Sequence, residues 1–122
     1  MHQALILFAH GARDPEWAAP LKRVREAIGT LQPGARVELA FLEFMAPSLS
    51  DCVAALAADG VGRVVILPMF IAQGGHLKRD VPILVGALRE RFPAVDIRLA
   101  EAVGENEAVV RAMAEAALAL LA

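Results

Sequence analysis

Two histidines follow apolar stretches of the chain, and their side chains are the best candidates for chemistry. His10 ends the apolar run 4–9, and His76 follows the apolar run 63–68 through a loop that contains Gly74 and Gly75. Neutral imidazoles are good ligands for first-row divalent metal ions. A pair of histidines is too few for a closed structural zinc site. The sequence therefore predicts an open site that binds a metal ion briefly and releases it.

Charged side chains flank the two histidines or follow other strand-like stretches. Glu43 and Glu101 each follow such a stretch, and either could accept a proton or supply a third ligand. Arg13, Lys78 and Arg79 lie near the histidines in sequence and would attract carboxylates. In many proteins such residues are solvated surface charges, and that alternative stays open.

Apolar and small residues near the histidines could contact a flat ligand. Met45, Met69 and Phe70 could form an apolar floor, although such side chains more often belong to a core. Gly74 and Gly75 would allow a ligand to approach the backbone closely, or would serve a turn.

The expected order of strands and helices determines where these residues lie in the fold. Apolar runs and alternating stretches predict strands at 4–9, 36–42, 63–68 and 95–99. Helices are expected after each strand, starting near Asp14, Ser48, Asp80 and Asn106. Strand and helix thus alternate four times, which predicts an α/β fold with a parallel sheet between two helical layers.

Burial patterns predict the order of the strands. The first and third strands are apolar throughout and should be central, while the second and fourth alternate and should be edges. This gives a four-stranded flavodoxin-like sheet of order 2-1-3-4. In such sheets a ligand binds at the carboxyl ends of the strands where the winding reverses. That point lies between the strands that deliver His10 and His76.

Apolar side chains also recur at helical spacing in the first and last helices. Trp17, Leu21, Val24, Ile28 and Leu31 predict one buried stripe. The last helix, which is expected to start near Asn106, carries a second set: Val109, Met113, Ala116 and Leu120.

Composition limits the class of protein. The 122 residues predict a single domain, residues 1–122, and the net charge of −2 argues against nucleic acid as the main partner. No apolar run is long enough to span a membrane, and no secretion signal is evident. Cys52 is the single cysteine, which fits buried packing and a cytoplasmic location. Nucleotide-binding glycine motifs are absent, so no nucleotide or organic cofactor is expected.

Three motifs resemble those of the sirohydrochlorin chelatases, the ATP-independent chelatases of the cobalamin and siroheme pathways. They are Leu7-Phe8-Ala9-His10-Gly11, Phe41-Leu42-Glu43-Phe44-Met45 with Pro47-Ser48, and Pro68 to Pro82 around Gly74-Gly75-His76. The resemblance implies insertion of Co²⁺ or Fe²⁺ into sirohydrochlorin, with nickel less expected. It implies that His10 and His76 bind the metal and that Glu43 takes part in catalysis.

The resemblance also implies an assembly. The chain is similar to one half of the longer two-domain chelatases, and short members of this kind work as homodimers with a cleft between the subunits. Ala12 stands where many relatives have serine, which removes one hydroxyl beside His10.

Two other functions remain open at this point. A chelatase-like domain could store or deliver a metal ion or a tetrapyrrole without turnover. A flavodoxin-like enzyme could instead use His10 for phosphoryl transfer, although Ala9 occupies the place of the arginine found in histidine phosphatases.

Overall fold

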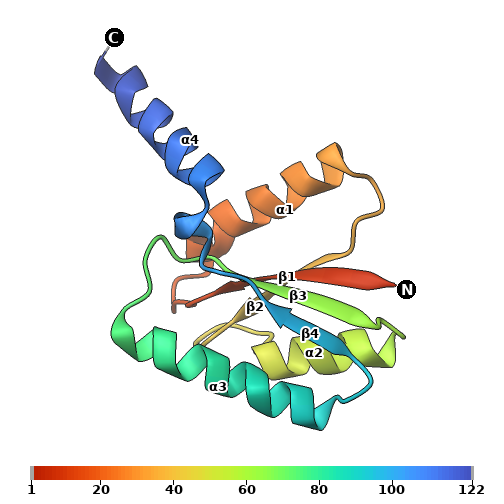
Figure 1. Cartoon of the computed structure of the whole chain (residues 1–122). Coiled ribbons are helices and arrows are strands. Elements are labelled where there is room, and N and C mark those ends of the chain that lie inside the picture. Colours follow the sequence, from red (N-terminus) through yellow and green to blue (C-terminus); the bar gives the residue numbers. More distant parts are fainter. Residues whose placement is uncertain (1, 122) are drawn as a thin grey trace.

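The computed structural model describes residues 2–121 and consists of four strands, four α-helices and three short 3₁₀ turns (Figure 1). The strands are β1 (Gln3–Ala9), β2 (Val37–Phe41), β3 (Arg63–Pro68) and β4 (Asp96–Leu99). The α-helices are α1 (Ala19–Leu31), α2 (Leu49–Ala58), α3 (Gly75–Arg91) and α4 (Glu107–Leu118). The 3₁₀ turns are η1 (Pro15–Ala18), η2 (Val103–Glu105) and η3 (Ala119–Leu121).

The four strands form one parallel sheet in the order β2-β1-β3-β4, which confirms the predicted order. β1 pairs with β2 through Ala9 opposite Phe41 and with β3 through Phe8 opposite Pro68. The three strands therefore end at the same edge of the sheet. The loops that carry His10, Glu43 and the approach to His76 all leave from that edge.

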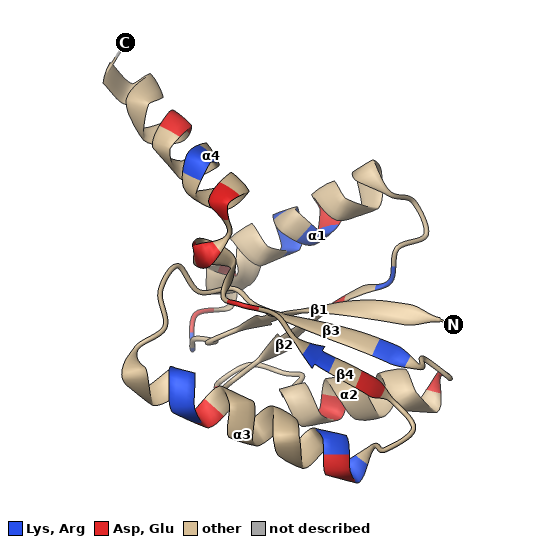
Figure 2. Ribbon diagram, in the orientation of Figure 1, with Lys and Arg blue, Asp and Glu red and all other residues tan. Residues whose placement is uncertain are grey.

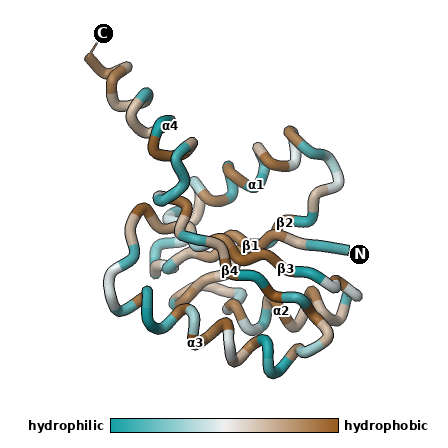
Figure 3. Tube along the Cα trace, viewed as in Figure 1, coloured by the Kyte–Doolittle hydropathy of each residue, from teal (hydrophilic) through white to brown (hydrophobic). Residues whose placement is uncertain are grey.

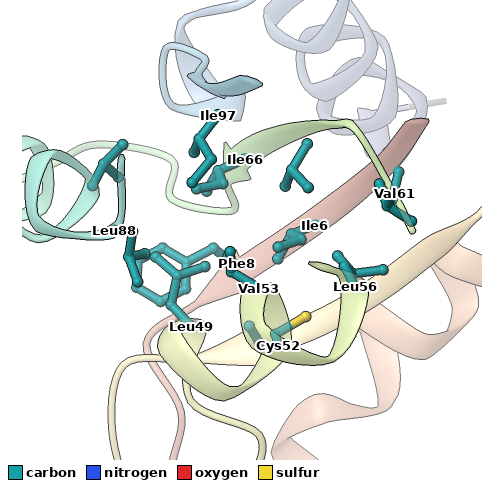
Figure 4. Close-up of a cluster of buried hydrophobic side chains, with 14 of the residues drawn as sticks. Ile6, Phe8, Leu49, Cys52, Val53, Leu56, Val61, Ile66, Leu88 and Ile97 are labelled. Atoms are coloured by element: carbon teal, nitrogen blue, oxygen red, sulfur yellow. The ribbon is translucent and has the colours of Figure 1, made fainter. Parts of the chain in front are cut away.

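One face of the sheet is covered by α2 and α3 and holds the larger core (Figures 1 and 4). Ile6 and Phe8 from β1 and Ile66 from β3 are fully buried there. Helix α2 contributes Leu49, Cys52, Val53 and Leu56, and helix α3 contributes Val81, Val85 and Leu88. These helix residues recur at intervals of three and four in sequence, which is the spacing of one buried helix face.

The opposite face is covered by α1 and has a smaller core. Its buried members are Leu7, Ala9, Ala18, Leu21, Leu39 and Phe41. The predicted stripe on α1 is wrong for three of its residues, because Trp17, Val24 and Leu31 are 41%, 38% and 84% exposed. Helical spacing identified an apolar stripe but could not show that no element of this chain packs over its outer part.

Three of the four predicted helix starts, near Asp14, Ser48 and Asn106, are correct. At the last of them the Asn106 side chain caps α4 by accepting a hydrogen bond from the Ala108 N–H at 2.9 Å. The Asp14 carboxylate accepts a hydrogen bond from the Glu16 N–H at 2.9 Å, and the Ser48 hydroxyl accepts one from the Asp51 N–H at 3.1 Å. Pro20 fits because the 3₁₀ turn η1 precedes α1, which begins at Ala19. The proline therefore lies in the first helical turn, where its missing N–H costs little.

The predicted start of α3 is wrong. The helix begins at Gly75 rather than near Asp80, and the Lys78 N–H already donates to the Gly74 carbonyl at 3.1 Å. Asp80 is therefore not a helix cap, and Pro82 lies inside the helix. Proline is strongly disfavoured in helix interiors, so Pro82 predicted a helix that begins shortly before it. Tertiary packing places the start of the helix earlier, at Gly75.

Helix α4 follows η2 and projects away from the sheet beyond α1 (Figures 1 and 3). None of its residues is buried, although Val109, Met113 and Ala116 recur along it at helical spacing. Within residues 2–121, no helix is both long and apolar enough to cross a membrane.

Cys52 is 4% exposed in the larger core, and burial raises the pKa of its thiol to about 11 from the usual 9.0. The thiolate is the reactive form, so Cys52 should stay unreactive at pH 8 while the protein is folded. We expect Ellman's reagent to label it slowly in buffer and rapidly in urea. Labelling in buffer should accelerate as the pH approaches 11. Fast labelling of the folded protein at pH 8 would contradict the burial of this side chain.

Candidate functional site

His10 and Glu43 form the first part of the site. His10 directly follows β1, Glu43 lies two residues after β2, and the His10 Nε2 is 3.0 Å from the Glu43 Oε1. Backbone bonds extend the strand pairing into both loops, since the Leu42 N–H donates to the Ala9 carbonyl and the Glu43 N–H donates to the His10 carbonyl. Both side chains are about half exposed, at 47% and 48%. The pair is thus fixed at its base and open to solvent at its tip.

Gly11 allows these two loops to lie against each other. Its φ is +94°, and a Cβ at this position would collide with the Glu43 carbonyl oxygen. In the sequence, Gly11 is recognisable only as the residue that follows His10. The contact with Glu43 joins residues more than thirty positions apart, so no local pattern could reveal it.

His76 forms the second part of the site, in the first turn of α3. Its side chain is 79% exposed, and its Nε2 lies 3.2 Å from the Asp80 Oδ2 one helical turn later. The Nδ1 lies 3.0 Å from the Arg79 Nη2. Since a guanidinium can only donate, Nδ1 accepts in this arrangement and the Nε2–H of a neutral ring donates to Asp80. The sequence predicted Asp80 as a helix cap, so this contact was not expected.

One cavity of about 630 Å³ brings the two parts together. It lies at the carboxyl edge of the sheet, between the loops after β1 and β2 and the start of α3. Its polar lining consists of His10, Glu43, His76 and Asp80 beside Gly74, and its apolar lining consists of Leu42, Leu77, Val81 and Leu84. The cavity therefore presents two imidazole–carboxylate pairs next to an apolar wall.

The His10–Glu43 pair and the His76–Asp80 pair do not combine into one metal-binding cluster. Among residues 2–121, no three histidine, cysteine, aspartate or glutamate side chains lie close enough together to hold a metal ion. Such a site could receive a cation on two neutral imidazoles and leave its other coordination positions to a ligand. The neighbouring carboxylates could accept protons from that ligand.

The predicted cationic residues lie around the cavity rather than inside it. Arg13 stacks over the Phe44 ring with its guanidinium carbon 4.9 Å from the ring centroid. Lys78 is exposed on α3, and Arg79 contacts both His76 and Asp80. Figure 2 shows the basic and acidic residues next to each other at the start of α3. This side of the opening therefore carries positive charge that an anionic ligand would meet.

The predicted apolar floor lies elsewhere. Phe70 is buried and packs edge-to-face on Phe8, with ring centroids 6.3 Å apart. Met45 lines a different hollow, beside η1 and α1, and Met69 packs against the smaller core. The apolar wall of the histidine cavity comes instead from Leu42 and from α3. Glu101 follows β4 and does not line this cavity.

Gly74 and Gly75 have ordinary backbone conformations, and a Cβ at either position would meet nothing within 4 Å. Their φ angles therefore do not require glycine. Open space next to the backbone at the mouth of the cavity leaves room for a large ligand, which is compatible with the close ligand approach expected for these glycines.

Known proteins that are similar to this chain share its fold and identify its family. The CbiX family model matches residues 4–119. A sirohydrochlorin cobaltochelatase of Saccharolobus solfataricus is 31% identical over 111 residues, which cover 86% of this chain and 85% of that protein. The sirohydrochlorin cobaltochelatase of Methanopyrus kandleri is 32% identical over 83 residues. That alignment covers 68% of this chain and 58% of the Methanopyrus protein, which is less than two thirds of its length.

Two solved structures are also similar to this chain. A CbiX protein from Marinobacter aquaeolei VT8, assigned to cobalamin (vitamin B12) biosynthesis, superposes with a TM-score of 0.86 at 31% identity and covers 99% of this chain. The structure of SirB from Bacillus subtilis with Fe³⁺ superposes with a TM-score of 0.75 at 25% identity. That match covers 92% of this chain but 44% of SirB, so the chain corresponds to about half of the larger protein.

The contact between Gly11 and Glu43 can be tested by adding a methyl group. Gly11→Ala should lower the free energy of unfolding by about 3 kcal/mol or more, because it combines a disfavoured φ with a backbone collision. Gly34→Ala is the matched control, since Gly34 has a φ of +91° and open space around it. The control should cost about 1 kcal/mol. Urea unfolding measures both, and equal losses would contradict the close approach of the two loops.

Proposed function

This chain belongs to the CbiX family, and we propose that it inserts Co²⁺ or Fe²⁺ into sirohydrochlorin. The observation that carries the proposal is the shared cavity of His10 and His76 at the carboxyl edge of the sheet. The relatives named sirohydrochlorin cobaltochelatase and the Fe³⁺-containing SirB structure support the choice of substrate and metal. We propose that residues 1–122 act as one chelatase-like domain, equivalent to half of a two-domain chelatase.

His10 and His76 would receive the metal substrate. Each imidazole carries a carboxylate partner on its Nε2, Glu43 in one case and Asp80 in the other. A divalent cation would bind the Nε2 lone pair of the tautomer that carries its proton on Nδ1, and the carboxylate would then lie beside the cation. In His76 this tautomer requires the Arg79 guanidinium to move away from Nδ1. Two imidazoles hold first-row divalent ions firmly enough to collect them and weakly enough to release them to a better ligand.

The macrocycle would supply that better ligand. Sirohydrochlorin carries many carboxylates, and Arg13, Lys78 and Arg79 surround the opening with positive charge. The apolar wall formed by Leu42, Leu77 and Leu84 would contact the ring, and the open space at Gly74 and Gly75 would admit its edge. The metal ion would then move from imidazole nitrogen to pyrrole nitrogen.

Two pyrrole protons must leave as the metal ion enters the ring. Glu43 is our candidate for the group that accepts one of them, because its carboxylate lines the cavity and already faces the His10 ring at 3.0 Å. Asp80 occupies the equivalent position beside His76 and would hold that ring in place. Neither step requires a nucleotide or an organic cofactor.

We further propose that the protein works as a homodimer in the cytoplasm, with the macrocycle between two subunits. The exposed histidines favour this arrangement, because a cavity open on one side leaves room for a second wall. Buried Cys52, the chain's single cysteine, fits a reducing compartment. Co²⁺ and Fe²⁺ are both retained as substrates, and Ni²⁺ is less favoured.

The two histidines can be tested by spectroscopy. We expect His10→Ala and His76→Ala each to reduce the insertion rate at least about 100-fold, because each removes half of the proposed metal-binding pair. The assay mixes protein, Co²⁺ and sirohydrochlorin without oxygen and follows the absorption change of the macrocycle. His2→Ala is the matched control, since His2 is exposed at the other end of β1.

Two outcomes would overturn the proposal. A wild-type rate no greater than the rate without protein would leave a protein that binds or delivers metal or tetrapyrrole without turnover. Equal loss of activity in His2→Ala would show that the effect does not come from the cavity. Titration with Co²⁺ separates binding from turnover, because each cavity variant should also bind Co²⁺ more weakly.

The role of Glu43 can be tested by Glu43→Gln, which keeps the size of the side chain and removes its basicity. Loss of a proton acceptor should slow insertion by about 10²–10⁴-fold. Co²⁺ binding should change far less, because both imidazoles remain. Glu101→Gln is the control, since Glu101 lies outside the cavity, and it should react at the wild-type rate. Comparable rates for the two variants would remove Glu43 from the mechanism.

A further inference from the structure

The loop after β2 contains Phe44, the one residue other than glycine with a positive φ among residues 2–121. Its φ is +66°, and the Met45 N–H donates across it to the Glu43 carbonyl at 2.8 Å. Together these features define a γ-turn of the rare kind with a positive central φ. A bulky side chain strains this conformation, because its Cβ crowds the following carbonyl oxygen. Glycine or asparagine would fit the turn at lower cost, so the backbone does not explain an aromatic residue here.

Burial within the chain does not explain Phe44 either. Of the five phenylalanines, all within the described residues, it is the one that is largely exposed, at 58%. Phe8, Phe41 and Phe70 are buried, and Phe92 is partly buried against the larger core. Strained backbone is concentrated at active sites and at contacts with ligands. An exposed ring on a strained turn therefore indicates a residue that binds something outside the chain.

The strained turn is held in place by the candidate site itself. The Glu43 N–H donates to the His10 carbonyl at 3.0 Å. The Glu43 carbonyl, which closes the turn, is the atom that a Cβ on Gly11 would meet. The Phe44 ring is thus fixed one residue away from the Glu43 carboxylate that lines the histidine cavity.

Arg13, from the loop after β1, stacks over the Phe44 ring with its guanidinium carbon 4.9 Å from the ring centroid. Within residues 2–121, no carboxylate forms an ion pair with Arg13. Other arginines of this chain do pair with a carboxylate: Arg36, Arg63, Arg79, Arg98 and Arg111. The aromatic ring therefore orients a guanidinium whose charge is left for a ligand.

The loops after β1 and β2 thus carry two side-chain pairs in succession. The His10–Glu43 pair lines the cavity, and the Arg13–Phe44 pair follows it in both loops without lining the cavity. Sirohydrochlorin is flat and carries its carboxylates around the edge of the ring. A macrocycle with its centre at the histidines would therefore reach beyond the cavity lining. An aromatic ring can contact the face of such a molecule, and a guanidinium can bind a carboxylate with two parallel hydrogen bonds.

We propose that Phe44 and Arg13 recognise the macrocycle, the Phe44 ring by contact with its face and Arg13 by binding one of its carboxylates. This inference rests on the proposed function, because it names residues that select the substrate of that reaction. The strained turn holds the ring outside the core and beside Glu43. Neither residue takes part in metal binding, so recognition of the macrocycle and binding of the metal can be altered separately.

Substitution of Phe44 separates recognition from stability. Phe44→Asn removes the ring and suits the positive φ, so the midpoint of urea unfolding should rise. The KM for sirohydrochlorin should increase about tenfold, and so should the Kd of metal-free sirohydrochlorin measured by absorption titration. Phe44→Tyr keeps the face of the ring and should retain the wild-type KM and Kd. Titration with Co²⁺ alone should give the wild-type affinity for both variants.

Substitution of Arg13 tests the second half of the pair. Arg13→Gln should also increase the KM for sirohydrochlorin about tenfold. Arg91→Gln is the matched control, because the Arg91 guanidinium carbon lies 5.0 Å from the Phe92 ring centroid but at the last residue of α3, whereas the cavity lies at its first turn. This control should keep the wild-type KM. In the Phe44→Asn/Arg13→Gln double variant the loss should be smaller than the product of the single losses, because each side chain positions the other.

Four outcomes would contradict the role of this pair. Wild-type KM and Kd in Phe44→Asn would remove the contact with the macrocycle, and equal KM values for Arg13→Gln and Arg91→Gln would remove the carboxylate contact. A lower urea midpoint in Phe44→Asn would give the ring a structural role. Light scattering that shows a change of oligomeric state in Phe44→Asn would place the ring against a second chain.

The proposed function can fail separately from this inference. A wild-type protein that inserts no Co²⁺ would refute the chelatase activity, while titration with metal-free sirohydrochlorin would still compare the wild type with Phe44→Asn. Conversely, wild-type insertion that is lost in His10→Ala but unchanged in Phe44→Asn and Arg13→Gln would retain the activity and refute the recognition by this pair.

Discussion

The parallel pairing of β1 with β2 on one side and β3 on the other is the interaction on which the rest of the structure depends. Parallel strands end at the same edge of a sheet, so the residues that follow them are brought together however far apart they are in sequence. Here that edge collects His10, Glu43 and the segment that leads to His76. The fully buried faces of β1 and β3 stabilise this pairing, because Ile6, Phe8 and Ile66 lose all contact with water.

Beyond the ends of the strands, backbone contacts position the site more finely. The bond from the Glu43 N–H to the His10 carbonyl continues the β1–β2 ladder by one step, and Gly11 then lets the two loops touch. The polar side chains can therefore remain about half exposed and still keep a defined geometry. The proposed function, in which the site receives a metal ion and a large macrocycle, would use this combination of a fixed base and an open mouth.

The two helical layers differ in how completely they cover the sheet. Helices α2 and α3 bury one face with a continuous set of aliphatic side chains, whereas α1 covers only part of the other. The apolar residues left exposed on α1 and α4 are as regular in spacing as the buried ones on α2 and α3. Spacing by itself therefore does not distinguish a helix face that the chain buries from one that it leaves exposed.

Local patterns predicted the strands, their order, two helix caps and the edge at which His10 and His76 meet, because apolar periodicity and turn residues act over a few positions. Contacts between distant segments decided the rest. The start of α3 at Gly75, and with it the His76–Asp80 pair, depends on how the loop after β3 packs, which outweighs the local preference of Pro82 for a first turn. Phe70 lies in the core and Leu42 lines the cavity, because the burial of a side chain depends on its neighbours in space. The stripes on α1 and α4 show the same limit, since spacing identifies an apolar face and only the folded arrangement decides what lies against it.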